Sequence, residues 1–278
     1  MKKQIIQKTV VYAILTLVAC YTVFPIIWMG LTSFKTEREI YRIPITFFPH
    51  EPTLENYKRI FTEMEYFPRY LFNSAFVTTV STLITVLIGA LAGYALARFD
   101  FKLKNLFLVI FLLLLAIPYG VYLIPLYIME FKLNLLNTYL GLIIPYTAVN
   151  LPWAIFILRA TFRTIPRDIE DSAKIDGCGY WGTFWKIMLP IGRQGAITAA
   201  IFTFVNIWSE LLFVMSLTET NDMRTLPYGI LLLRDEAQAF AYSTLAPAIV
   251  ISILPTLVMF ILLQNYFIKG AVEGSLKA

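Results

Sequence analysis

The sequence predicts an all-α integral membrane protein with six transmembrane helices. Of its 278 residues, 58% are hydrophobic and only 15% are charged, whereas soluble domains carry about 25% charged residues. The charges are also spread unevenly, so long uncharged stretches remain between them. Five of these stretches exceed the roughly 20 apolar residues that cross a bilayer as a helix. Helices apolar on every face exclude an ordinary soluble domain, and the mean hydropathy of +0.69 agrees.

Six segments are expected to span the bilayer, and only one of them contains a charged residue, Glu210. They are Thr9–Phe34, Tyr70–Ala97, Asn105–Met129, Leu133–Leu158, Gly195–Leu217 and Ala237–Ile268. Strands of a membrane barrel would alternate in polarity over about ten residues, and these segments do not. Prolines inside the segments predict kinks or breaks. They are Pro118, Pro125, Pro145, Pro152 and Pro255.

The distribution of Lys and Arg predicts that both termini are cytoplasmic. With that orientation, 14 of the 23 basic residues lie on the inner side, which carries a net charge of +8 against −2 outside. The first span is too long for a cleaved signal peptide and is expected to be retained. One histidine, His50, cannot form a histidine-based metal cluster, so no metal site is expected.

This topology divides the chain into three parts. Residues 1–69 form an N-terminal span and a long outer segment, residues 70–268 form a five-helix core, and residues 269–278 form a cytoplasmic tail. Within the outer segment, Lys35–Arg69, four prolines leave no room for a long continuous helix.

The long inner loop, Arg159–Arg193, predicts a helix, a turn and a second helix. Pro166 followed by acidic residues favours a helix N-terminus, and Gly177 favours a left-handed cap at its end. Ile169, Ser172, Ala173 and Asp176 share one face, whose small residues would let another surface approach. An aromatic stripe of Tyr180, Trp181, Phe184, Trp185 and Met188 follows and is typical of a helix at the membrane interface.

This loop resembles the EAA motif of permease subunits of binding-protein-dependent ABC importers. That motif is Glu-Ala-Ala, three residues, Gly, nine residues, then Ile-x-Leu-Pro. Here Asp171, Ser172 and Ala173 are followed at the same spacing by Gly177 and by Ile187–Pro190. Asp171 replaces the glutamate and Ser172 the first alanine, and both keep charge or small size.

Further segments resemble the carbohydrate-uptake branch of that family, in particular its shorter, maltose-type permease. They are Pro52–Tyr57, Tyr146–Pro152, Arg224–Pro227 and Asn265–Gly270. The resemblance implies the type I ABC importer permease fold in a prokaryotic inner membrane. It also implies a sister permease, two cytoplasmic ATPase subunits that bind ATP and Mg²⁺, and an external solute-binding protein.

In such an importer the inner helix would be a coupling helix that sits in a cleft of an ATPase. The residues that the resemblance assigns to ATPase coupling are Glu170, Asp171, Ser172, Ala173, Asp176 and Gly177. The chain itself would bind no cofactor and catalyse no reaction, since it lacks the phosphate-binding sequence G-x-x-x-x-G-K-[ST]. The pattern G-x-G-x-x-G at Gly177–Gly182 follows a charged helix and predicts no dinucleotide site.

Glu210 has two possible roles. An acidic residue within a span suggests function, so Glu210 and Trp208 could line the translocation path, where aromatic rings stack on sugars and carboxylates accept hydroxyl hydrogen bonds. Alternatively, Glu210 could have a structural role, either at the outer membrane interface or in a buried ion pair that holds the helices together. Tyr146 and Asn150, four residues apart on one helical face, are candidates for the same path.

Other functions remain as alternatives. The solute could be a di- or oligosaccharide, or instead glycerol phosphate or another polyol. An ion-coupled secondary transporter would need several intramembrane ionisable residues, and only Glu210 qualifies. A membrane-embedded enzyme has even less support, because the spans contain neither histidine nor paired acids.

Overall fold

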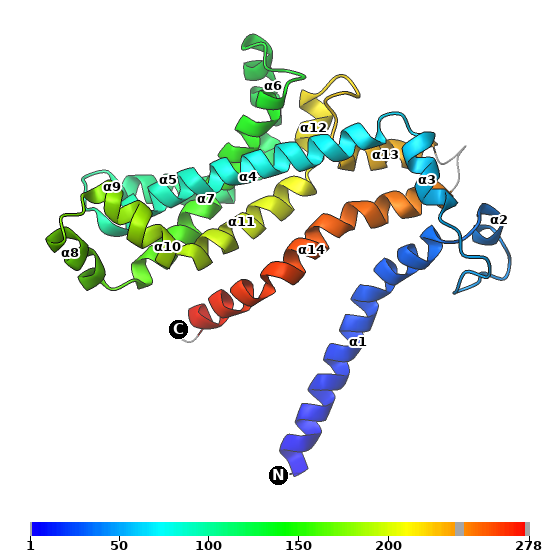
Figure 1. Ribbon diagram of the computed structural model, residues 1–278, viewed down its shortest axis with the longest axis horizontal. Helices are drawn as coiled ribbons and strands as arrows, with labels where there is room; N and C mark the ends of the chain where they lie inside the picture. The colour runs from blue at the N-terminus through cyan, green and yellow to red at the C-terminus, as the bar shows by residue number, and fades with distance from the viewer. Residues whose placement is uncertain (1, 237–241, 276–278) are drawn as a thin grey trace. The chain divides into compact units, whose positions relative to one another are not determined.

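The computed structural model describes residues 2–236 and 242–275, and every regular element in this part is helical, which confirms the all-α prediction (Figure 1). The long helices are α1 (Lys2–Ser33), α4 (Phe67–Arg98), α7 (Tyr139–Thr164), α11 (Arg193–Trp208) and α14 (Tyr242–Ser275). The helices before α7 are α2 (Glu37–Ile40), α3 (Glu55–Thr62), α5 (Lys104–Ala116), the 3₁₀ turn η1 (Tyr119–Tyr122) and α6 (Leu123–Lys132). Those after it are α8 (Arg167–Ile175), α9 (Tyr180–Thr183), the π-helical turn η2 (Phe184–Met188), α10 (Leu189–Ile191), α12 (Leu212–Leu217) and α13 (Leu226–Glu236).

Among the described residues, four continuous helices match predicted spans, and two bent helix pairs bring the number to six if each pair crosses the membrane as one span. The continuous ones are Gln7–Ser33, Phe67–Arg98, Tyr139–Thr164 and Tyr242–Gln264. The bent pairs are Lys104–Ala116 with Tyr119–Lys132, at 96°, and Tyr180–Ile191 with Arg193–Trp208, at 74°. Part of the last predicted span, residues 237–241, lies outside the described residues.

The first bend confirms a predicted proline break. α5 ends at Ala116, and Ile117 has extended backbone angles directly before Pro118. A proline disfavours the helical conformation of the residue before it and provides no N–H for the helix ladder.

The prediction that Gly195–Leu217 is one span is wrong. α11 ends at Trp208 and α12 begins only at Leu212, so Glu210 lies in the break between two helices rather than within one. The backbone N–H of Phe213 donates to both carboxylate oxygens of Glu210, at 3.0 and 3.1 Å. A polar side chain that accepts hydrogen bonds from N–H groups at a helix start can replace backbone acceptors. One helix can then end and another begin without leaving those N–H groups unpaired.

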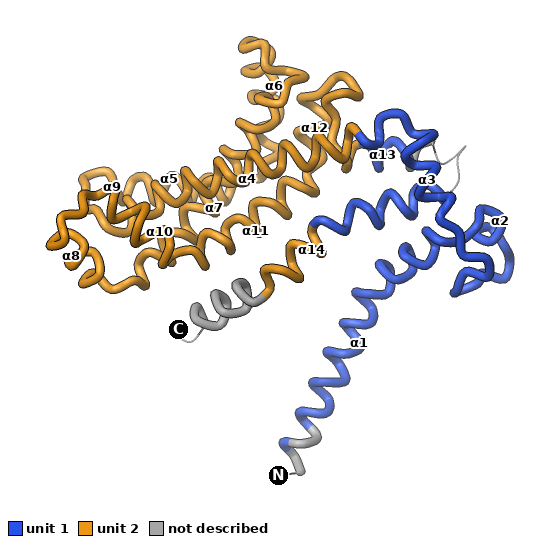
Figure 2. The backbone as a smooth tube through the Cα atoms, viewed as in Figure 1, with its two compact units in different colours: residues 1–68, 229–255 blue, residues 69–228, 256–278 orange. Residues whose placement is uncertain are grey.

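The chain divides into two compact units (Figure 2). The first comprises residues 1–68 and 229–255, and the second comprises residues 69–228 and 256–278.

In the first unit, short helices and side-chain hydrogen bonds order the outer segment. As predicted, it contains no long helix, only α2 and α3. The amide of Asn56 donates to the carbonyls of Ser33 and Lys35, at 2.9 and 2.7 Å. These bonds fix α3 against the end of α1, because they occupy carbonyls that the helix leaves unpaired.

In the second unit, α4, α7 and α11 pack around two apolar cores. One contains Ala90 and Tyr94 of α4, Leu158 and Phe162 of α7 and Ala199 of α11. The other lies nearer the opposite end of the helices. It contains Val77, Leu142, Ile143, Tyr146, Ile207, Phe213, Val214 and Leu217.

Glycines allow α4 to approach α7 closely. A Cβ added at Gly89 would lie 2.9 Å from the Cβ of Ala154, and one added at Gly93 would lie 2.9 Å from the backbone N of Arg159. Small residues spaced four apart are typical of membrane helix contacts, where packing and not the hydrophobic effect drives association.

At the far end from the inner loop, Asn73 of α4 connects three segments. Its amide donates to the carbonyls of Asp222 and Arg224, at 2.7 and 2.8 Å, and its carbonyl accepts from the Tyr139 hydroxyl at 2.8 Å. Asn73 is fully buried, so these bonds satisfy groups that would otherwise be costly to bury.

We predict that Gly93→Ala lowers the thermal unfolding midpoint of the purified complex, because the methyl group forces two backbones apart at a cost of about 1–3 kcal/mol. Gly30→Ala is the matched control, since no atom lies within 4 Å of its added Cβ, and it should be neutral or slightly stabilising. Differential scanning fluorimetry measures both midpoints. Equal midpoints for the two variants would contradict the close packing of α4 on α7.

Candidate functional site

The inner loop folds into α8, a short helix with a defined start and end. Acidic residues, among them Glu170, lie in its first turn, where they interact favourably with unpaired N–H groups. Gly177 follows the helix with φ of +81°, which confirms the predicted left-handed cap. The N–H of Gly177 donates to the carbonyl of Lys174 at 3.0 Å, and that of Cys178 to Ala173 at 2.9 Å. This pair of bonds closes the helix end.

The six residues assigned to ATPase coupling lie on two different faces of α8. Four are exposed, namely Asp171, Ser172, Asp176 and Gly177, and two are buried, namely Glu170 and Ala173. Ala173, one of the small residues of the predicted docking face, is only 3% exposed, so that face is not fully accessible in the chain. The exposed face includes Ile175 instead, which is 86% exposed.

The exposed face of α8 carries an ion pair. Lys174 Nζ lies 2.8 Å from Asp171 Oδ1. This hydrogen bond lowers the pKa of the Asp171 carboxyl and raises that of the Lys174 amine. Both groups are therefore charged near neutral pH and available to a polar partner.

The aromatic stripe after α8 divides between the surface and the core. Tyr180, Trp181 and Trp185 are 66%, 68% and 46% exposed, whereas Phe184 and Met188 are buried. The exposed three suit a membrane interface, where amphipathic aromatic rings are favoured. The buried two belong to the core that α4 and α7 share.

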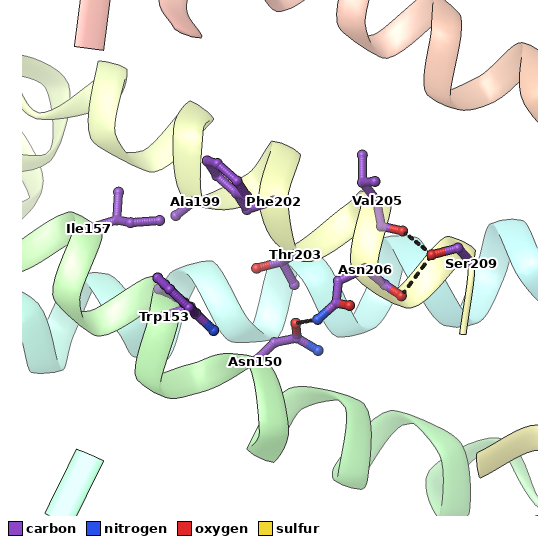
Figure 3. Close-up of a pocket in the computed structure, with 10 residues that line it drawn as sticks. Asn150, Trp153, Ile157, Ala199, Phe202, Thr203, Val205, Asn206 and Ser209 are labelled. Atoms are coloured by element: carbon purple, nitrogen blue, oxygen red, sulfur yellow. Dashed lines mark hydrogen bonds between the residues drawn. The ribbon is translucent and has the colours of Figure 1, made fainter. Parts of the chain in front are cut away.

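A pocket of about 530 Å³ lies between the middle of α7 and the C-terminal half of α11 (Figure 3). Its wall carries two aromatic rings, Trp153 from α7 and Phe202 from α11, which are 56% and 51% exposed. The remaining lining residues are Asn150, Ala154, Ile157, Ala199, Thr203, Val205, Asn206 and Ser209. All are uncharged, so the pocket suits a neutral solute.

Two amides form the polar part of the pocket. Asn206 Nδ2 donates to Asn150 Oδ1 at 2.7 Å (Figure 3). Asn150 Nδ2 in turn donates to the carbonyl of Tyr146 at 2.8 Å. The pair thus fixes the orientation of both side chains across the α7–α11 contact.

The carboxylate of Glu210 is held by the protein itself. The Tyr146 hydroxyl donates to Glu210 Oε2 at 2.7 Å, in addition to the bonds from the N–H of Phe213. The rings of Tyr146 and Phe213 stack with centroids 5.8 Å apart. This geometry favours the structural one of the two roles considered for Glu210, which is to fix the start of α12 against α7.

Of the four predicted path residues, only Asn150 lines the pocket. Tyr146 is buried beside Glu210, and Trp208 is 6% exposed and stacks on Phe204 with centroids 5.6 Å apart. The sequence analysis missed Trp153, Phe202 and Asn206. Their spacing in the sequence could have indicated them, because residues three or four apart lie on the same face of a helix. Asn150 and Trp153 are three residues apart, and Phe202 and Asn206 are four apart.

The model of one protein family, described as binding-protein-dependent transport system inner membrane component, matches residues 65–270. The chain belongs to this family. It is therefore a multi-pass inner-membrane permease subunit of an ABC importer and not the subunit that hydrolyses ATP, which confirms the resemblance seen in the inner loop.

Individual relatives agree. The chain is 41% identical over 254 residues, 91% of its length and 88% of the relative's, to the sulfoquinovosyl glycerol transport system permease protein SmoH of Agrobacterium fabrum. It is 32% identical over 280 residues, 100% of its length and 99% of the relative's, to the trehalose/maltose transport system permease protein MalG of Thermococcus litoralis.

The fold is that of a solved importer. A chain of a bacterial ABC transporter involved in the import of the acidic polysaccharide alginate matches with a TM-score of 0.82 at 21% identity, over 96% of this chain and 98% of that one. The match confirms the predicted type I permease fold.

We predict that Glu210→Ala lowers the yield of assembled importer and leaves solute uptake per assembled complex unchanged. The change removes the acceptor for Phe213 N–H and the Tyr146 hydroxyl, and each unpaired buried donor costs about 1–3 kcal/mol. Tyr146→Phe removes one of these bonds and should reduce the yield less. Normal yield with reduced uptake per complex would show instead that the carboxylate contacts the solute.

Proposed function

We propose that the chain is a sugar-specific permease subunit, one of two that form the pore of an ATP-driven importer. Its relatives carry names of sugar-related transport systems, SmoH and MalG among them. The α7–α11 pocket fits this substrate class, because aromatic rings stack on the apolar faces of sugars while amide and hydroxyl groups bind their hydroxyls.

The uncharged pocket favours a neutral sugar over the alternative, a polyol phosphate. A phosphate group needs Arg or Lys donors or a helix N-terminus to replace its hydration. None of the ten lining residues carries a charge. A di- or oligosaccharide is therefore the proposed solute.

The proposed mechanism depends on the position of α8 along the chain. The same helix connects the inner end of α7, at Thr164, to the segment that continues through α9 and η2 into α11. Since α7 and α11 form the pocket walls, a force on α8 acts directly on both walls.

The partners in this proposal are a sister permease, two cytoplasmic ATPase subunits and an external solute-binding protein. Both termini of the chain and α8 are on the cytoplasmic side, in keeping with the excess of basic residues there. An ATPase binds the exposed face of α8, with Ile175 inserted into a cleft of the ATPase and Asp171, Ser172, Asp176 and Gly177 around it. Burying a side chain such as Ile175 contributes roughly 1.5–3 kcal/mol.

ATP binding closes the two ATPases and moves each coupling helix as a rigid body. The pocket then opens alternately to the external binding protein and to the cytoplasm. Glu170 and Ala173 contribute by fixing α8 to the rest of the chain, since both side chains are buried.

We predict that Trp153→Ala and Asn206→Ala raise the sugar concentration for half-maximal uptake by at least about threefold, because each removes a contact worth about 0.5–1.5 kcal/mol or more. Assembly should remain normal. Leu140→Ala is the control, since Leu140 is also on α7 and also 56% exposed but does not line the pocket. The assay is uptake of radiolabelled sugar by the reconstituted importer, with disaccharides and glycerol phosphate compared. Unchanged uptake in both pocket variants would contradict the assignment of the pocket.

A further inference from the structure

A buried ion pair joins the inner end of α4 to α8. Arg98 is the last residue of α4 and Glu170 lies in the first turn of α8. Arg98 Nε pairs with Glu170 Oε1, and the two side chains are only 7% and 10% exposed. We refer to this contact as the α4–α8 ion pair.

Two further hydrogen bonds support the α4–α8 ion pair. Arg98 Nη2 donates to the carbonyl of Ile165 at 2.6 Å, directly before α8 begins. The Tyr94 hydroxyl, one helical turn before Arg98, donates to Glu170 Oε2 at 3.3 Å. Both charges are thus hydrogen-bonded as well as paired, which is what a buried pair requires.

An aromatic cluster excludes water from this contact. The ring of Tyr94 lies 5.7 Å from that of Phe162 on α7, 5.4 Å from that of Phe184 on η2 and 5.7 Å from that of Phe99. The cluster brings together residues of α4, α7 and η2. In this apolar setting the electrostatic attraction is stronger than at the surface.

In each of the other ion pairs among the described residues, at least one side chain is more than half exposed. Asp100, two residues after Arg98, pairs with Lys104 but is 85% exposed. In the Lys174–Asp171 pair both side chains are more than half exposed. Exposed ion pairs contribute little to stability or rigidity. The α4–α8 ion pair differs from them because both of its side chains are buried.

The chain connectivity alone does not attach α4 to α8. The peptide chain joins α8 only to α7 and to α9, and α4 ends about 70 residues before α8 begins. The close packing at Gly89 and Gly93 attaches α4 to α7, and the α4–α8 ion pair extends this attachment to the helix that would receive the ATPase.

We propose that Arg98, Glu170 and Tyr94 fix α4 rigidly to α8, so that displacement of α8 by an ATPase moves α4 together with α7 and α11. Glu170 is then a positioning residue for transport and not a contact of the ATPase. This inference rests on the proposed contact between α8 and the ATPase. Breaking the pair would leave a buried charge uncompensated, so the link persists through the transport cycle.

The direct test measures a distance in the complete, reconstituted importer with Cys20 and Cys178 replaced by serine. Spin labels are attached at Asp100→Cys, beside the end of α4, and at Asp168→Cys on α8, both at exposed positions. We expect the same distance distribution without nucleotide and with ATP trapped in the ATPases. A shift of the distribution between the two states would overturn the proposal.

A variant tests the consequence for transport. Glu170→Gln should reduce the number of sugar molecules imported per ATP hydrolysed by about tenfold, as expected when a charge-assisted contact is lost. Asp100→Asn, the same chemical change at an exposed neighbouring carboxylate, should leave this ratio unchanged. A wild-type ratio in Glu170→Gln would overturn the proposal.

If Glu170→Gln does not assemble, the double variant Arg98→Met with Glu170→Met fills the same space without charges, and such replacements of buried pairs are often neutral for stability. We expect it to assemble with the reduced import ratio. A wild-type ratio in this variant would overturn the proposal equally.

Failure of the proposed ATPase contact gives a different result. Ile175→Lys places a charge on the exposed face of α8 and leaves the α4–α8 ion pair intact. If the ATPase co-purifies normally with Ile175→Lys, the contact itself is wrong. The spin-label distance between α4 and α8 still reports separately on whether the two helices move together.

Discussion

A polar group in an apolar medium must find its partner inside the protein, and this constraint determines where the helices of this chain bend, break and meet. No water competes for backbone N–H and C=O groups inside a bilayer, so each break in a span needs replacement hydrogen bonds. The break after α11 is supported by the Glu210 carboxylate, which binds Phe213 N–H and the Tyr146 hydroxyl. The start of α4 is supported likewise by Asn73, which binds two backbone carbonyls of the loop before α13. Polar residues in the spans are therefore first of all structural partners of the backbone.

The same constraint gives the inner loop its function. Arg98 and Glu170 can be buried only because they pair with each other and with Ile165 and Tyr94. This pairing turns one face of α8 towards the core and leaves the opposite face, with Ile175, for a partner subunit. In the proposed importer, α8 is the helix that receives the ATPase, and α4, α7 and the segment that leads into α11 hold it together. A short helix held at several points can transmit a displacement without deforming, because packed elements move as units.

The sequence predicted the features that depend on local chemistry. Hydropathy predicted the four continuous spans, Pro118 predicted a break, and Gly177 predicted a left-handed cap, and the structure confirms all three. The sequence did not predict which face of α8 is buried. The partner of Glu170 lies some 70 residues earlier, and only the folded chain brings the two residues together. It missed the break around Glu210 for the same reason, since that acid acts through Tyr146 on another helix. The pocket depends on the pairing of Asn150 with Asn206 across α7 and α11, and neither helix alone indicates it.

In the mechanism that we propose, the α7–α11 pocket opens alternately to the two sides of the membrane under control of the ATPases. A single cysteine introduced at Asn206, with Cys20 and Cys178 replaced by serine, tests it in liposomes containing the complete importer. A membrane-impermeant maleimide is added on one side or the other, with and without trapped ATP. We expect the cysteine to react from one side without nucleotide and from the opposite side with ATP trapped. Reaction from the same side in both states, or from neither side in either state, would contradict the account.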